Sequence, residues 1–167
     1  EWGFFTESTP GASNTTTDYS GIVKNEPTFS ISGGIFHNSI TLKIKTLYGG
    51  DVRYTLDGTE PNEQSPVAKN SINITKNTVV RARIYKQGQV LGPIVTNSYL
   101  IDTNNELTDL PIISIVSDPK NFWDPEIGIY VVHDSKPDWE IPINIELFEK
   151  DGRDKAAFNL PAGAKST

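Results

Sequence analysis

Apolar and polar residues alternate along most of this chain with a period of two, which is typical of β-strands that have one buried face. In the clearest run, Val52, Tyr54 and Leu56 alternate with polar side chains, and the run ends at Asp57 and Gly58. Glycine takes a positive φ without strain, and an aspartate side chain bonds to backbone N–H groups just ahead of it. The pattern therefore predicts a strand that ends in a tight turn.

Other runs along the first two thirds of the chain predict further short strands. The expected inward side chains are Ile40, Leu42 and Ile44 in residues 38–46 and Val80, Ala82 and Ile84 in residues 78–86, with Arg81, Arg83 and Tyr85 outward. Shorter strands are expected around Phe29 and Ile31, at residues 65–68 as an edge, around Ile72 and Ile74, and at residues 94–101. About seven strands with frequent turn signals predict an immunoglobulin/fibronectin-III-like β-sandwich over residues 27–102.

A second, smaller β-rich unit is predicted over residues 108–167, after a polar connector at residues 102–109. Strands are expected at residues 110–117, 128–132 and 141–147, with a hairpin turn at residues 151–152. The first of these is nearly continuous in apolar residues, which is typical of a strand buried on both faces. No segment has a convincing helical period, so the fold class predicted for the whole chain is all-β.

Residues 1–26 are polar and rich in turn formers, which predicts an extended lead-in. Trp2, Phe4 and Phe5 are unusual in such a segment, and we expect them to pack against another part of the protein. One interpretation is a tail docked on the sandwich. The other follows from the order of Trp2 and residues 9–14 (TPGASN), which resembles the closing segment of lamin-tail type β domains.

Several dispersed motifs resemble one known family. They are residues 27–30 (PTFS), 33–34 (GG), 54–61 (YTLDGTEP) and 78–82 (TVVRA). Together they are similar to the chitobiase/beta-hexosaminidase C-terminal type module, a fibronectin-III-associated β-sandwich, over about residues 27–101. The resemblance implies a non-catalytic accessory, spacer or interaction module of a secreted or cell-surface bacterial protein.

The second unit has a resemblance of its own. Its motifs are residues 110–119 (LPIISIVSDP), 128–131 (GIYV), 139–142 (WEIP) and 146–152 (ELFEKDG). They resemble the opening of the CotH (spore-coat protein H) type kinase family, over about residues 110–163. The resemblance implies a truncated CotH-like domain, and as an alternative function the N-terminal part of an atypical protein kinase whose active site lies downstream of this chain.

Composition and charge exclude several classes of function. The net charge is −6 and the 15 Lys and Arg residues are scattered, which argues against a nucleic-acid surface. No apolar run is long enough to span a membrane. The chain has no Cys, which excludes a disulfide framework and a Cys-based zinc site, and no glycine-rich phosphate loop, so we predict no catalytic activity in these residues. It has no Met and begins at Glu1, so we expect a processed or excised piece.

Four aromatic residues are candidates for stacking on sugar rings: Tyr48, Tyr85, Trp123 and Trp139. Aromatic faces suit the apolar faces of sugars, although such residues more often pack in a core. An alternative function is therefore a carbohydrate-binding module. The predicted partners are a polysaccharide or another surface protein, and other domains of the same polypeptide.

The loop of residues 117–126 gathers the carboxylates of Asp118, Asp124 and Glu126. Hard oxygen ligands of this kind could hold Ca²⁺, but the two prolines of the loop also suit acids that only form turns. Calcium is the one cofactor that the sequence suggests. His37 and His133 have no helix-spaced partners, which favours surface or capping roles.

Overall fold

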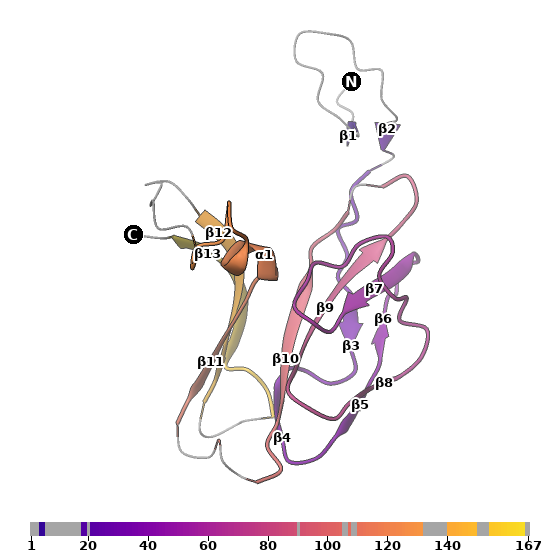
Figure 1. The fold of residues 1–167 in the computed structure, drawn as a ribbon. Helices are drawn as coiled ribbons and strands as arrows, with labels where there is room; N and C mark the ends of the chain where they lie inside the picture. The colour runs from indigo at the N-terminus through magenta and orange to yellow at the C-terminus, as the bar shows by residue number, and fades with distance from the viewer. Residues whose placement is uncertain are drawn as a thin grey trace.

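In the computed structural model, the regular secondary structure of the described residues is almost entirely β-strand (Figure 1). It describes residues 4–5, 18–19, 21–89, 91–104, 107, 110–131, 140–149 and 154–165. The described strands form a β-sandwich, a separate three-stranded sheet, and a short pair between β1 (Phe4–Phe5) and β2 (Asp18–Tyr19). The predicted all-β fold class is confirmed.

One layer of the sandwich is a four-stranded sheet with the strand order β4-β10-β9-β7. Its members are β4 (Gly34–Phe36), β7 (Asp51–Thr55), β9 (Thr78–Tyr85) and β10 (Val95–Ile101). β4 runs parallel to β10, and the other neighbours are antiparallel. The predicted edge at residues 65–68 pairs with β7 through a single bridge between Val67 and Arg53.

The other layer consists of two strand pairs. β3 (Thr28–Phe29) pairs with β6 (Ile44–Lys45), and β5 (Ile40–Leu42) pairs with β8 (Ile72–Ile74). β5 and β6 are the single strand predicted at residues 38–46, interrupted at Lys43. There the backbone N–H of Lys43 donates to the Ser30 hydroxyl, and its carbonyl accepts from the Ser30 N–H, both at 2.9 Å.

The chain crosses from one layer to the other between β3 and β4. The buried Tyr99 of β10 fixes this crossing, because its hydroxyl donates to the carbonyl of Ile31 at 2.7 Å. The backbone N–H of Gly33 donates to the side chain of Asn97 at 3.3 Å. As a result, the first and last parts of the sandwich lie side by side.

The core of the sandwich lies between the two layers. Its fully buried side chains include the predicted inward residues Leu42, Ile44, Val80, Ala82 and Ile84. Val23 also belongs to this cluster and is 5% exposed, so the sandwich begins a few residues before the predicted start at residue 27. Asp102 continues the β4 pairing, because its N–H donates to the carbonyl of Phe36 at 2.7 Å.

The second part is an antiparallel sheet in the order β11-β12-β13. Its strands are β11 (Ile112–Val116), β12 (Glu140–Phe148) and β13 (Phe158–Lys165). β11 was expected to be buried on both faces, and this prediction is wrong. Ile113 and Ile115 are 59% and 54% exposed because the described residues cover only the opposite face of the sheet.

Two other predictions for this part need correction. Residues 128–131 form turns, not a strand, because Gly128 bonds back to the carbonyl of Asp124 and Val131 bonds back to Gly128. A five-residue helix, α1 (Pro119–Trp123), precedes them, and it is too short to produce a periodic pattern. The expected hairpin turn at residues 151–152 lies outside the described residues.

In the part of the chain that the structure describes, no helix is both long and apolar enough to cross a membrane.

Tyr99→Phe should destabilise the sandwich while leaving its fold intact. The substitution removes the only atom of the side chain that bonds to Ile31, and the loss of a partly buried hydrogen bond costs about 0.5–1.5 kcal/mol. We expect the free energy of unfolding, measured by urea denaturation, to fall by that amount. Tyr48→Phe is the matched control, because Tyr48 is 61% exposed. Equal stability of the two variants would contradict the role of the Tyr99 hydroxyl.

Candidate functional site

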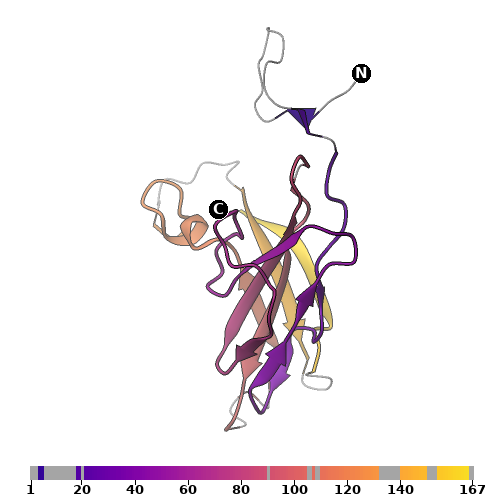
Figure 2. The ribbon, with the colours of Figure 1, turned by 90° about the vertical axis from the view of Figure 1, so that its right-hand side faces the viewer.

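The three-stranded sheet stands beside β10 (Figure 1) and lies behind the sandwich in the view of Figure 2. Glu146 of β12 lies at the centre of this junction and is completely buried. Its Oε1 atom accepts hydrogen bonds from the Ser98 backbone N–H at 3.1 Å and from the Asn159 side chain at 3.2 Å. One carboxyl group therefore joins β10, β12 and β13.

Further polar contacts surround this carboxyl group. The hydroxyls of Ser98 and Ser114 lie 2.7 Å apart and share a hydrogen bond between β10 and β11. The side-chain amide of Asn159 donates to the carbonyl of Thr96 at 2.7 Å. Gly33 leaves room for the approach, because a Cβ atom there would come within 2.8 Å of Oε1 of Glu146. Directional hydrogen bonds thus hold the two parts together.

The environment of Glu146 disfavours its ionised form. Burial raises the pKa of this carboxyl, although its hydrogen bonds from Ser98 act in the opposite direction. Its Oε2 atom has no hydrogen-bond partner among the described residues. A buried carboxylate with one unsatisfied oxygen is unfavourable, so the proton is bound more tightly in the folded protein than in the unfolded chain.

The turn at residues 57–61 forms a second contact between the parts. The guanidinium of Arg81 donates to the Gly58 carbonyl at 2.9 Å and lies 3.9 Å from the Glu60 carboxylate. The Glu60 backbone N–H donates to the Asp118 side chain at 3.2 Å. Arg81 points outward from the core of the sandwich as predicted, but it is only 8% exposed because the turn and the loop that contains Asp118 cover it. Burial lowers the pKa of Arg81, and the charges of Glu60 and Asp118 partly oppose this.

Two of the three acids proposed as calcium ligands, Asp118 and Asp124, have separate structural roles. Asp118 caps α1 by accepting from the Lys120 N–H at 3.1 Å. Asp124 accepts from the backbone N–H groups of Glu126 and Ile127 in the following turn. Among the residues that the structure describes, no three acids or histidines are close enough to hold a metal ion. The loop therefore does not bring these three carboxylates together.

The predicted aromatic residues lie in different places. Trp123 stacks on Tyr130 with ring centroids 5.1 Å apart, and both rings are more than 60% exposed. Tyr130 was not among the residues predicted to stack on sugar rings. Trp139 and His133 lie outside the described residues. The His37 ring lies 3.3 Å from the carbonyl of Asp102, at the end of the sandwich.

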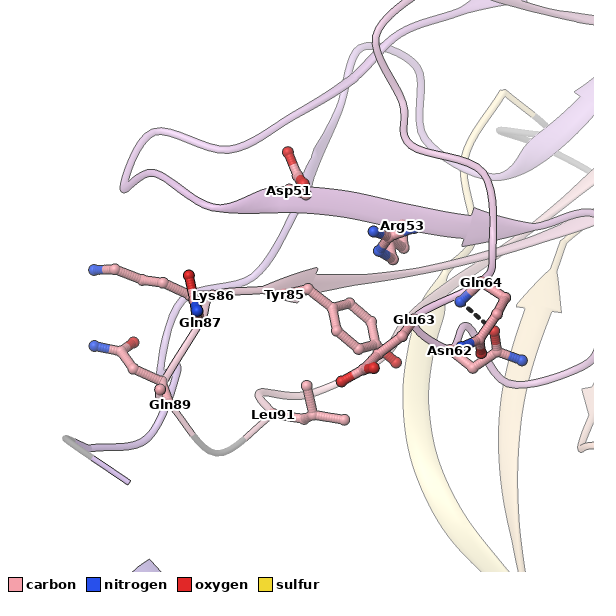
Figure 3. Close-up of a pocket in the computed structure, with 11 residues that line it drawn as sticks. Asp51, Arg53, Asn62, Glu63, Gln64, Tyr85, Lys86, Gln87, Gln89 and Leu91 are labelled. Carbon is pink, nitrogen blue, oxygen red and sulfur yellow. Dashed lines mark hydrogen bonds between the residues drawn. The ribbon is translucent and has the colours of Figure 1, made fainter. Parts of the chain in front are cut away.

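Tyr85 lies in a groove of about 740 Å³ on the outer face of β7 and β9 (Figure 3). Its hydroxyl donates to the carbonyl of Pro61 at 2.7 Å, and the Arg53 guanidinium lies over its ring, 5.8 Å from the centroid. Tyr48 lines an adjoining depression of about 320 Å³, and both hollows include Lys86 and Gln89 in their walls. The hollows that contain two of the four predicted aromatic residues therefore adjoin each other.

Residues 31–96 match the family model of the chitobiase/beta-hexosaminidase C-terminal domain. The match begins at the crossing between the layers and ends within β10, and it covers less than half of the chain. A domain of this type is a non-catalytic accessory module, and residues 31–96 of the sandwich are similar to it. The groove beside Tyr85 lies within the matched residues. No curated protein and no solved structure matches the chain.

Glu146→Gln should make the stability of the sandwich and its adjoining sheet less sensitive to pH. The pKa of Glu146 is raised in the folded protein. The stabilisation that comes from binding its proton is therefore complete below the pKa that this carboxyl has in the unfolded chain, and it is lost as the pH rises through the pKa in the folded protein. Glutamine keeps the Oε1 acceptor and carries no charge. We therefore expect thermal unfolding at a series of pH values to show the variant gaining stability over the wild type as the pH increases.

Glu149→Gln provides the control for that experiment, because Glu149 is exposed just beyond the end of β12. Parallel curves of stability against pH for the wild type and Glu146→Gln would show that the buried carboxyl does not titrate as the geometry requires.

Proposed function

We propose that this chain is a non-catalytic accessory segment of a secreted or cell-surface bacterial protein, in which the sandwich holds the start of a CotH-like domain in a fixed position. The observation that carries the proposal is the buried Glu146 carboxyl, which bonds to β10 of the sandwich and to β13 of the adjoining sheet. Domains of one chain usually move relative to each other unless a substantial interface prevents it.

The character of the junction supports a positioning role. Hydrogen bonds have narrow requirements for distance and angle, and buried donors and acceptors are expensive to leave unpaired. A junction formed by Ser98, Asn159 and Glu146 is therefore satisfied in one relative orientation and loses several bonds in others. The Arg81, Glu60 and Asp118 contact adds a second point of attachment, which opposes rotation about the first.

The outer face of the three-stranded sheet supports the proposal that it is one layer of a larger domain. Cross-strand neighbours on this face are Ile113, Leu147 and Phe158 in one row and Ile115, Ile145 and Leu160 in the next. The four residues on β11 and β13 are between 38% and 59% exposed. A sheet buries its apolar face against another layer, so further residues of a CotH-like domain would cover these rows.

The proposed location rests on the type of module. The chitobiase/beta-hexosaminidase C-terminal domain type occurs in extracellular glycosidases, which supports a secreted or surface-exposed protein. The alternative to a purely structural role is that this chain is the N-terminal part of an atypical protein kinase. Its active site would then lie downstream of these residues.

Hydrogen exchange on the intact chain tests whether the two parts form one cooperative unit. We expect the slowest amides of β9 and of β12 to exchange with the same opening free energy and the same dependence on denaturant. The double variant Ser114→Ala/Asn159→Ala changes no residue of the sandwich. It removes the hydrogen bond of Ser114 to Ser98 and those of the Asn159 amide to Thr96, Asn97 and Glu146. It should lower the protection of β12 and of β9 together, by about 1–3 kcal/mol for each lost contact, because both segments exchange through the same opening.

Asn70→Ala, at an exposed position of the sandwich, is the matched control and should change neither segment. If β9 and β12 of the wild type exchange through independent openings, the two parts are separate units and the positioning role is ruled out.

A further inference from the structure

The groove beside Tyr85 has the composition of a site for a neutral polar ligand, and it lies on the sandwich away from the junction with the three-stranded sheet. Its walls come from β7, from the loop after Pro61 and from the turn after β9, as Figure 3 shows. At about 740 Å³ it is within the range of roughly 300–1,000 Å³ that is usual for ligand sites. We propose that this groove binds a neutral oligosaccharide chain.

Tyr85 provides the flat surface at the middle of the groove. Its hydroxyl is fixed by the Pro61 carbonyl, and the Arg53 guanidinium, itself bonded to the Ser65 carbonyl at 2.7 Å, lies over the ring. Both contacts restrict rotation of the side chain before any ligand arrives. A preorganised ring loses little conformational entropy on binding, and an aromatic face suits the C–H face of a sugar ring.

Amide side chains lie at both ends of the groove. Asn62 and Gln64 stand at one end, and Gln87 and Gln89 stand at the other, with Tyr85 between them (Figure 3). An amide both donates and accepts hydrogen bonds, which matches the hydroxyl groups of a sugar. A ligand that spans the groove would therefore meet adaptable polar groups on either side of a stacking surface.

The charges of the groove favour a neutral ligand over an ionic one. Asp51 and Glu63 contribute two negative charges, and Arg53 and Lys86 contribute two positive charges. A polyanion such as a nucleic acid or an acidic polysaccharide is attracted by an excess of Lys and Arg, which this groove does not have. The balance of charge leaves hydrogen bonding and stacking as the main sources of affinity.

The depression that contains Tyr48 indicates that the ligand is a chain and not a single sugar. It adjoins the groove through the shared residues Lys86 and Gln89, and Tyr48 is 61% exposed. A second aromatic side chain next to the first site would contact further residues of a longer ligand. Affinity should accordingly increase with the length of the oligosaccharide.

Titration calorimetry of the full chain with defined oligosaccharides tests this site. The probes are β-1,4-linked disaccharides and hexasaccharides of glucose, xylose, mannose and N-acetylglucosamine, with hexagalacturonate as the acidic probe. We expect at least one neutral hexasaccharide to bind, and to bind more tightly than its disaccharide. Tyr85→Ala should weaken that binding about tenfold or more, whereas Tyr85→Phe, which keeps the ring, should retain most of it.

Three further variants change only exposed side chains and keep the test independent of folding. Gln64→Ala/Gln87→Ala changes only exposed side chains and should also weaken binding, while Trp123→Ala removes an exposed ring outside the groove and should have no effect. Tyr48→Ala should weaken binding of the hexasaccharide more than that of the disaccharide.

Three outcomes would overturn the proposal. The first is no binding of any neutral hexasaccharide. The second is binding that depends on Trp123 and is unchanged in Tyr85→Ala and in the glutamine double variant. The third is binding of hexagalacturonate alone, which would show that charge and not stacking determines the ligand.

Discussion

The relative position of the two parts of this protein depends on one buried carboxyl group. Glu146 is completely buried, and its Oε1 atom accepts from a donor of each part, namely the Ser98 backbone N–H and the Asn159 amide. Isolated in an apolar interior, such a group would strongly destabilise the fold. Its stability therefore requires the sandwich and the three-stranded sheet to be present together, and each part completes the hydrogen bonding of the other.

The sandwich was largely predictable because its strands alternate regularly and each has one face in a single core. Val80, Ala82 and Ile84 are buried as the period of two requires, and Asp57 with Gly58 forms the expected turn. The alternation could not show that β3 and β4 belong to different layers. That depends on Tyr99 and Asn97, which bond to the crossing segment from more than 60 residues away in the sequence.

The second part was harder to predict because apolar residues on one face of its sheet are exposed, whereas a polar residue on the other face is buried. The apolar residues of β11 and β12 were expected to be the buried ones, yet Ile113 and Ile115 are exposed and the polar Glu146 is buried. An alternating pattern shows that the two faces of a strand differ in polarity. It does not show which of the two faces another element covers. Similarly, the candidate groove combines Tyr85 with residues from the loop after Pro61 and from the turn after β9, and only the fold brings these segments together.

The parallel pairing of β4 with β10 has a mechanical consequence. Tension applied through the chain would pull β4 from the end nearest Gly34 and β10 from the end nearest Ile101. Because the strands are parallel, these forces point in opposite directions along the ladder and load the register pairs from Gly34 with Tyr99 to Phe36 with Ile101 in shear. Bonds loaded together resist force better than bonds opened one after another, so this geometry would protect the sandwich against stretching.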